Sequence, residues 1–226
     1  MKMGMSPTTM KVTQLSRFGG PEVFEVVEKL TPKPSPGQVL VRVRAAGVNF
    51  ADTLMRENWY AVTPELPAIL GTEVAGVIEG LGDGVDGLAV GGRVAAPLFA
   101  AGVFFGGYAE YVSIDARFVA PLPDALSFEE ATALMVQGLT ALYLIRRAPP
   151  QDKTVLITAA AGGVGSLLVQ LAKRAGAKTV IAAASTMEKL DFACSIGADV
   201  GVNYTQTDWG KQALAANGGV GPDIIY

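Results

Sequence analysis

The chain has 226 residues, half of them hydrophobic, with 27 Gly and 13 Pro, which suits one large or two small globular domains rather than a disordered protein. The formal net charge of −3 and the isoelectric point near 5.1 indicate no attraction to nucleic acids or to membrane surfaces. No apolar run is long enough to span a bilayer and the amino terminus lacks an apolar signal core, so we expect a cytoplasmic protein.

The absence of histidine is the most restrictive feature of the composition. It excludes a histidine general base, Ser–His or Cys–His nucleophile pairs and histidine-ligated metals. Because Cys194 is the single cysteine, a tetrahedral zinc site is not expected either. We therefore expect no metal site, and a cofactor that carries the chemistry among hydroxyl, amide and carboxylate groups.

Short β-strands separated by turns are predicted from about residue 10 to about residue 125. Alternating valines indicate one strand over residues 39–43, and further strands are expected at 23–27, 73–79, 93–98 and 108–114. Strands at this spacing suggest a small, strongly bent β domain.

The pattern changes at Pro121 and Pro123. Ser127 and Glu130 have the spacing of a capping box that begins a helix, and a second helix is predicted over 139–147. From residue 154 strands and helices alternate, with strands at 154–159, 179–184 and 200–204 and helices at 165–175 and 186–196. That order predicts right-handed βαβ crossovers on a parallel sheet.

We thus expect two domains, residues 1–126 and residues 127–226. A doubly wound dinucleotide-binding domain uses about six strands, whereas this chain reaches Tyr226 with a fourth strand barely begun at 223–226. The second domain is therefore expected to be truncated, with an apolar strand on an uncovered edge that promotes aggregation. We expect the 226-residue polypeptide alone to be unstable and nearly inactive.

The turn after the strand at 154–159 is the most informative segment. Ala160-x-Gly162-x-x-Gly165 is the dinucleotide-binding G-x-G-x-x-G pattern with alanine in the first position. Small residues let the backbone approach a pyrophosphate, and free N–H groups at the helix start hold its charge. The position between a strand and a helix supports this interpretation. The alternative is a turn whose glycines only let the helix pack on the strand.

The end of the second strand favours NADP over NAD. An acidic residue there would bind the ribose 2′-hydroxyl and repel a 2′-phosphate, but the strand ends Ala-Ala-Ala-Ser at 182–185. Lys189 falls in the first turn of the next helix, where the macrodipole disfavours a cation. Contact with a 2′-phosphate would explain this lysine, and a solvated surface lysine is the alternative. Glu188, three residues after Ser185, is expected to complete a capping box.

These motifs resemble the medium-chain dehydrogenase/reductase superfamily, in its zinc-free, zeta-crystallin-like NADPH:quinone oxidoreductase branch. Besides the glycine turn, the resemblance rests on AAGVNFAD, LGTEVAG, GGYAEYV and GLT at residues 45–52, 70–76, 106–112 and 138–140. It implies an α/β fold, with a GroES-like β-barrel domain followed by a Rossmann domain that is truncated here, and an active site in the cleft between them. The zinc alcohol dehydrogenases of the superfamily carry metal ligands at the positions of Asn49, Thr72 and about Val136, and none of these residues binds zinc well.

The resemblance also implies a set of site residues. The catalytic residues would be Asn49, beside the nicotinamide, and Tyr60, either a proton donor or an aromatic wall of the substrate cleft. The expected cofactor-binding residues are Asn49, Thr140, Gly162, Gly163, Val164, Ser185, Lys189 and Tyr204. Of these, Thr140 would bind the carboxamide, the glycine turn the pyrophosphate, and the last three the 2′-phosphate. Asp52 and Glu73 are expected to be structural, and Phe99, Phe104 and Phe105 to line the pocket or pack in the core.

Motifs and resemblance together predict a zinc-independent oxidoreductase that uses NADPH to transfer a hydride to a quinone or another conjugated acceptor, a small molecule. The alternatives are an enoyl-thioester reductase of the same superfamily and a non-catalytic, crystallin-like NADPH-binding protein. No nucleic acid or membrane partner is expected, and the full-length protein is expected to be a homodimer.

Overall fold

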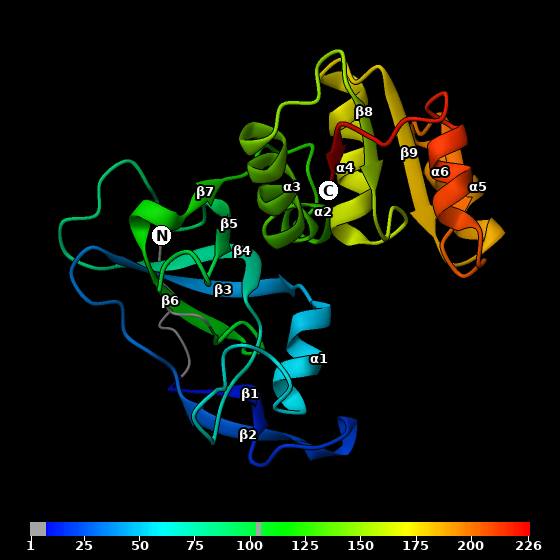
Figure 1. Cartoon of the computed structure of the whole chain (residues 1–226). Helices are drawn as coiled ribbons and strands as arrows, with labels where there is room; N and C mark the ends of the chain where they lie inside the picture. Colours follow the sequence, from blue (N-terminus) through cyan, green and yellow to red (C-terminus); the bar gives the residue numbers. More distant parts are fainter. Residues whose placement is uncertain (1–7, 103–104) are drawn as a thin grey trace. The chain divides into compact units, whose positions relative to one another are not determined.

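The computed structural model describes residues 8–102 and 105–226. Its contacts divide the chain into two compact units, Met1–Val136 (unit 1) and Gln137–Tyr226 (unit 2) (Figure 1). A β-rich unit 1 and a parallel α/β sheet in unit 2 confirm the predicted fold class. The domain boundary expected at residues 126 and 127 stays a prediction.

Unit 1 is built on a five-stranded antiparallel sheet. Its order is β6 (Tyr111–Asp115), β3 (Gln38–Ala46), β4 (Glu73–Leu81), β5 (Arg93–Pro97) and β7 (Ala120–Pro121). Register shifts interrupt the pairing of β3 with β4 at two places, and such irregularities bend a strand pair. Gly76 is required between them, because a Cβ there would lie 2.1 Å from the carbonyl oxygen of Arg42. The two register shifts favour the strong bend that the sequence predicts.

A two-stranded antiparallel ribbon of β1 (Thr9–Leu15) and β2 (Phe24–Leu30) also belongs to unit 1. The short helix α1 (Phe50–Arg56) follows β3. The sequence predictions contain neither β1 nor α1, and the strand predicted at 108–114 begins only at Tyr111. Tyr108 precedes that strand, and its carbonyl oxygen accepts a hydrogen bond from the amide of Thr13 in β1 (2.8 Å).

Arg93 fixes the segment between β7 and α2 (Phe128–Ala133) to the start of β5. Its guanidinium donates to the carbonyl oxygens of Pro123 (2.9 Å) and Leu126 (2.6 Å) and lies 4.6 Å from the ring centroid of Phe128. The predicted capping box is confirmed at the start of α2, where Ser127 and Glu130 exchange hydrogen bonds between side chain and backbone. This segment, whose residues 123–125 are exposed, is therefore held in one conformation.

Unit 2 is a four-stranded parallel sheet with helices on both faces. The strand order is β10 (Val200–Asn203), β9 (Thr179–Ala184), β8 (Thr154–Ile157) and β11 (Ile224–Ile225). The helices are α3 (Val136–Arg147), α4 (Gly163–Arg174), α5 (Met187–Ser195) and α6 (Trp209–Ala215). The sequence predictions contain all of these elements except α6.

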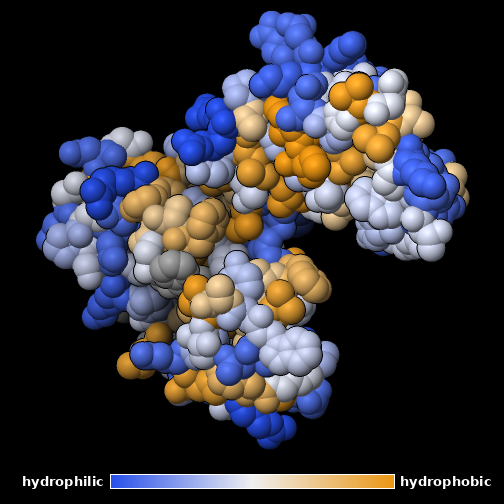
Figure 2. All heavy atoms as spheres, in the orientation of Figure 1, coloured by the Kyte–Doolittle hydropathy of each residue, from blue (hydrophilic) through white to orange (hydrophobic). Residues whose placement is uncertain are grey.

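The two central strands of unit 2, β8 and β9, are buried on both sides, as in sheets flanked by helices. Val155 and Ile157 of β8 pack with Leu168 of α4, whereas Leu156, between them, packs with Ala213 of α6 on the other face. β11 pairs only with β8 among the described residues, and its Ile225 is 66% exposed. Figure 2 shows hydrophobic side chains gathered over the part of unit 2 where Figure 1 places α3 and β11.

Candidate functional site

The glycine turn of unit 2 connects β8 to α4. Gly165 lies so close to the turn that a Cβ would be 2.2 Å from the carbonyl oxygen of Ala159. Ala160 is completely buried, and its amide donates to the carbonyl oxygen of Ala183 at the end of β9 (3.1 Å). A small residue at position 160 and a glycine at position 165 are therefore required by the backbone of the turn.

The start of α4 is open. Gly162 is the N-cap, and no side chain in the described part of the chain caps it. Both Gly162 and Gly163 are exposed to solvent. The first amide groups of a helix have no partner inside the helix, so this end can hold an anion.

A polar corner formed by Ser185, Lys189 and Tyr204 follows the ends of β9 and β10. The ammonium of Lys189 donates to the hydroxyl of Ser185 (3.2 Å). The amide of Tyr204 donates to the carbonyl oxygen of Ala184 (3.1 Å), which brings the residue after β10 beside the end of β9. Since the glycine turn is bonded to Ala183, the three residues lie at the same edge of the sheet as the turn.

The capping box expected between Ser185 and Glu188 is wrong. The N-cap of α5 is Thr186, whose hydroxyl accepts from the amide of Lys189 (3.3 Å). The helix thus begins one residue later than the box would require. Ser185 stands outside the helix, and its hydroxyl contacts Lys189 instead.

Thr140 lies in α3, and Tyr60 lies in the loop after α1 with its side chain 40% exposed. Their expected contacts with a nicotinamide and with a substrate stay predictions, as does the cofactor contact expected of Asn49. Phe105 packs beside Leu15, Met55 and Leu70 in a core cluster of unit 1. Phe104 falls outside the described residues.

A buried polar cluster of unit 1 surrounds Asn49, the N-cap of α1. Its side-chain nitrogen donates to the hydroxyl of Thr72 (3.2 Å) and to the carboxylate of Glu73 (3.0 Å). The second oxygen of Glu73 accepts from the amide of Val136 (2.6 Å). The amide of Asn49 thus joins Thr72 to Glu73, and the carboxylate of Glu73 joins this pair to the backbone of Val136. In the described parts of the chain, no group of three His, Cys, Asp or Glu side chains could hold a metal ion.

Asp52 extends this cluster in the other direction along α1. Its carboxylate accepts from the amide of Asn49 (2.8 Å) and from the hydroxyl of Tyr108 (3.0 Å). Burial raises the pKa values of Asp52 and Glu73 above their usual ranges, and the charge of Asp52 adds to the effect on Glu73. Burial and the neighbouring Asp52 also raise the pKa of Tyr108.

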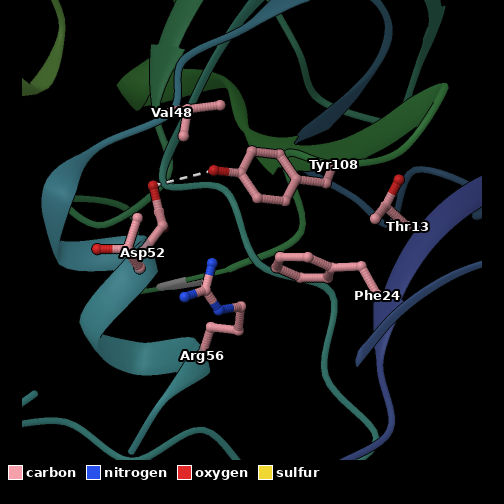
Figure 3. A pocket seen from close by; sticks show the side chains of 7 residues that line it. Thr13, Phe24, Val48, Asp52, Arg56 and Tyr108 are labelled. Atoms are coloured by element: carbon pink, nitrogen blue, oxygen red, sulfur yellow. Dashed lines mark hydrogen bonds between the residues drawn. The ribbon is translucent and has the colours of Figure 1, made fainter. Parts of the chain in front are cut away.

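A cavity of about 340 Å³ opens beside the Asp52–Tyr108 pair (Figure 3). Its walls combine apolar and polar side chains from β1, β2, α1 and the loops before α1 and before β6, namely Thr13, Phe24, Val48, Asp52, Thr53, Arg56 and Tyr108. The rings of Phe24 and Tyr108 meet edge to face with centroids 6.4 Å apart. Sequence reasoning did not find this cavity, although Asp52 and Arg56 have the i, i+4 spacing of one helix face.

Replacing Asp52 with asparagine should change how the stability of the chain depends on pH. Burial raises the pKa of Asp52 above its ordinary value of 3.8. The carboxyl group of Asp52 therefore loses its proton at a lower pH in the unfolded chain than in the folded chain. Its contribution to the free energy of unfolding therefore falls as the pH rises from about 4 to the folded-state pKa, and is constant above it. Because asparagine does not titrate, the stability of Asp52→Asn relative to the wild type should rise over that interval.

Urea unfolding followed by circular dichroism, from about pH 4 to about pH 8, measures this difference. Asp86→Asn is the matched control, because Asp86 is exposed. The same pH dependence for both variants would contradict the assignment of a buried carboxyl group with a raised pKa.

Comparison with known proteins adds to this geometry. The family model "Alcohol dehydrogenase GroES-like domain" matches residues 35–124, and "Zinc-binding dehydrogenase" matches residues 163–226. The quinone oxidoreductase of Salmonella typhimurium is 37% identical over 94% of this chain and 64% of its own length. The quinone oxidoreductase of Rattus norvegicus is 34% identical over 99% of this chain and 67% of its own.

Among solved structures, the Escherichia coli quinone oxidoreductase complexed with NADPH matches with a TM-score of 0.83 and 34% identity. The match covers 92% of this chain and 63% of that one. The chain thus spans about two thirds of the length of the curated relatives it matches. None of the helices in the part of the chain that the structure describes has the length and apolarity of a membrane span.

Proposed function

The chain belongs to the medium-chain dehydrogenase/reductase superfamily, in its quinone oxidoreductase branch, and we propose that it forms part of an NADPH-dependent oxidoreductase. One observation carries the proposal: the open helix start of α4 and the Ser185–Lys189 pair lie at one edge of the sheet, joined through the end of β9. That edge is where parallel α/β sheets bind nucleotides. The relative in Escherichia coli, which is complexed with NADPH, supports the choice of cofactor.

The residues present fit this cofactor. Gly162 and Gly163 have no side chains, and both are exposed at the helix start. A pyrophosphate could therefore approach the backbone of Gly162, Gly163 and Val164 closely. Ser185, Lys189 and Tyr204 would hold the 2′-phosphate, because the corner offers a hydroxyl and an ammonium and β9 ends without an acidic residue. Thr140 would bind the carboxamide of the nicotinamide.

NADPH, when bound, supplies a hydride for an electron-poor acceptor. The side chains of this chain would orient the acceptor, exclude water and provide a proton. Thr72 and Glu73 fix the amide of Asn49, which we propose faces the reacting atoms. The hydroxyl of Tyr60 is the candidate for holding the proton that the reduced acceptor takes up, with water as the alternative donor.

We propose a quinone or another conjugated carbonyl compound as the acceptor, in line with the names of the relatives. We propose that zinc has no part in the reaction, because the residues that the family resemblance places at the zinc-ligand positions, Asn49, Thr72 and about Val136, are poor zinc ligands. For the whole protein we propose a cytoplasmic homodimer without nucleic acid or membrane partners.

Fluorescence titration with NADPH and NADH tests the cofactor, and NADPH should bind at least about tenfold more tightly, a difference of about 1.4 kcal/mol. NADPH oxidation is then followed with 1,2-quinones, enals and enoyl thioesters. Turnover of quinones or enals supports the proposal, and turnover of enoyl thioesters alone favours the enoyl reductase. Tight binding without any turnover would favour a non-catalytic NADPH-binding protein. Oxidation of saturated alcohols with no reduction of these acceptors would contradict a conjugated-acceptor reductase.

A further inference from the structure

The side chain of Gln137, in α3, lies against the start of α4. A Cβ built on Gly163 would be 2.8 Å from Cγ of Gln137 and 3.5 Å from both Cδ and Nε2. Contacts under 3.0 Å force a shift, and Cγ is not the free end of the side chain. The glycine at position 163 therefore leaves the space that the Gln137 side chain occupies.

This contact places a carboxamide beside the helix start that we assign to the pyrophosphate. Gly163 is the first residue of α4 and is itself exposed, so Gln137 lies alongside it without closing the helix start. A carboxamide carries two N–H donors and no charge. Beside the start of α4, the carboxamide of Gln137 can therefore donate to a bound anion together with the backbone N–H groups of the turn.

We propose that Gln137 is a cofactor-binding residue, whose carboxamide donates a hydrogen bond to the phosphate held at the start of α4. The inference rests on the proposed NADPH site and adds a residue from a second helix to it. It also gives a reason for an amide side chain at position 137 and for a glycine at position 163.

The first experiment measures NADPH binding by fluorescence titration in the wild type, Gln137→Met and Gln137→Glu. Methionine keeps the length of the side chain and removes the donors, so the dissociation constant should rise roughly three- to tenfold. Glutamate brings a negative charge beside the phosphate, and the constant should rise more than about tenfold. Adenosine 2′-monophosphate, followed by NMR titration, is the control ligand, because it carries the 2′-phosphate and lacks the pyrophosphate. Its affinity should be the same in all three proteins.

Three outcomes would overturn the inference. Unchanged NADPH affinity in Gln137→Glu would exclude a contact with the phosphate. An equal loss for both ligands, together with a lower melting temperature, would show that Gln137 only supports the fold. If the wild type binds no NADPH, the proposed function itself fails, and the inference fails with it.

A second experiment tests the contact between the two side chains. Gly163→Ala should lower the melting temperature in the wild type and lower it less in a Gln137→Ala background, because the shorter side chain leaves room for the new methyl group. The same decrease in both backgrounds would show that Gln137 does not occupy the space above Gly163.

Discussion

Gly165→Ala is expected to destabilise unit 2 by about 2–3 kcal/mol and to remove measurable NADPH binding. The new Cβ would lie 2.2 Å from the carbonyl oxygen of Ala159 and 2.8 Å from Cα of Ala160. Both are backbone atoms, so no side-chain rotation relieves the clash and the turn itself must move. Its displacement would separate the amide groups at the start of α4 from the position at which a pyrophosphate binds.

Urea unfolding and NADPH titration measure the two effects of Gly165→Ala. Gly210→Ala in α6 is the matched control, since a Cβ there meets nothing within 4 Å. In a helix the change from glycine to alanine is stabilising by up to about 1 kcal/mol. Equal stability and equal NADPH affinity in the two variants would show that the turn tolerates a side chain at position 165.

Lys189→Ala is expected to weaken NADPH binding about tenfold and to leave NADH binding nearly unchanged. A charge-assisted hydrogen bond to a phosphate contributes about 1.5–3 kcal/mol, and the lower end applies because Lys189 is exposed. The affinities of both coenzymes are measured by fluorescence titration at one ionic strength, because salt screens such contacts.

Lys211→Ala controls for the loss of one positive charge, because Lys211 is exposed on α6 of the same unit. A negative charge can also be introduced at this corner. Ser185→Asp should shift the preference toward NADH, because an aspartate there would repel the 2′-phosphate. Position 184 does not suit this purpose, because Ala184 is only 2% exposed and an aspartate there would be buried. Equal weakening of both coenzymes by Lys189→Ala would show that the lysine does not contact the 2′-phosphate.

The sequence predicts unit 2 well because its signals are local. Buried β-branched runs, helical periodicity and a glycine turn follow one another within a few residues, and almost every element lies where they indicate. The misplaced start of α5 has a local cause too. Ser185 and Thr186 are adjacent and both are good N-cap residues, so sequence alone does not decide between them.

Unit 1 is harder to predict, because its important contacts join residues far apart in the chain. α1 has only seven residues and an exposed Phe50 at its start, which conceals its periodicity, although Asn49 and Asp52 have capping-box spacing. Nothing in the sequence near Glu73 indicates that its carboxylate accepts from the amide of Val136. The pairing of Tyr108 with Asp52 likewise depends on the folded structure, and in unit 2 the same is true of the packing of Gln137 on Gly163.

The contacts of Arg93 have a consequence for proteolysis. The segment 123–125 is exposed and lies outside any helix or strand, so it would be expected to be an early site of cleavage. A protease, however, must draw several residues of its substrate into an extended conformation, and the rate of cleavage then follows the free energy of local opening rather than exposure. Opening here requires the guanidinium of Arg93 to release two carbonyl oxygens and the ring of Phe128. The exposed connection before α2 should therefore resist digestion as long as β5 remains folded.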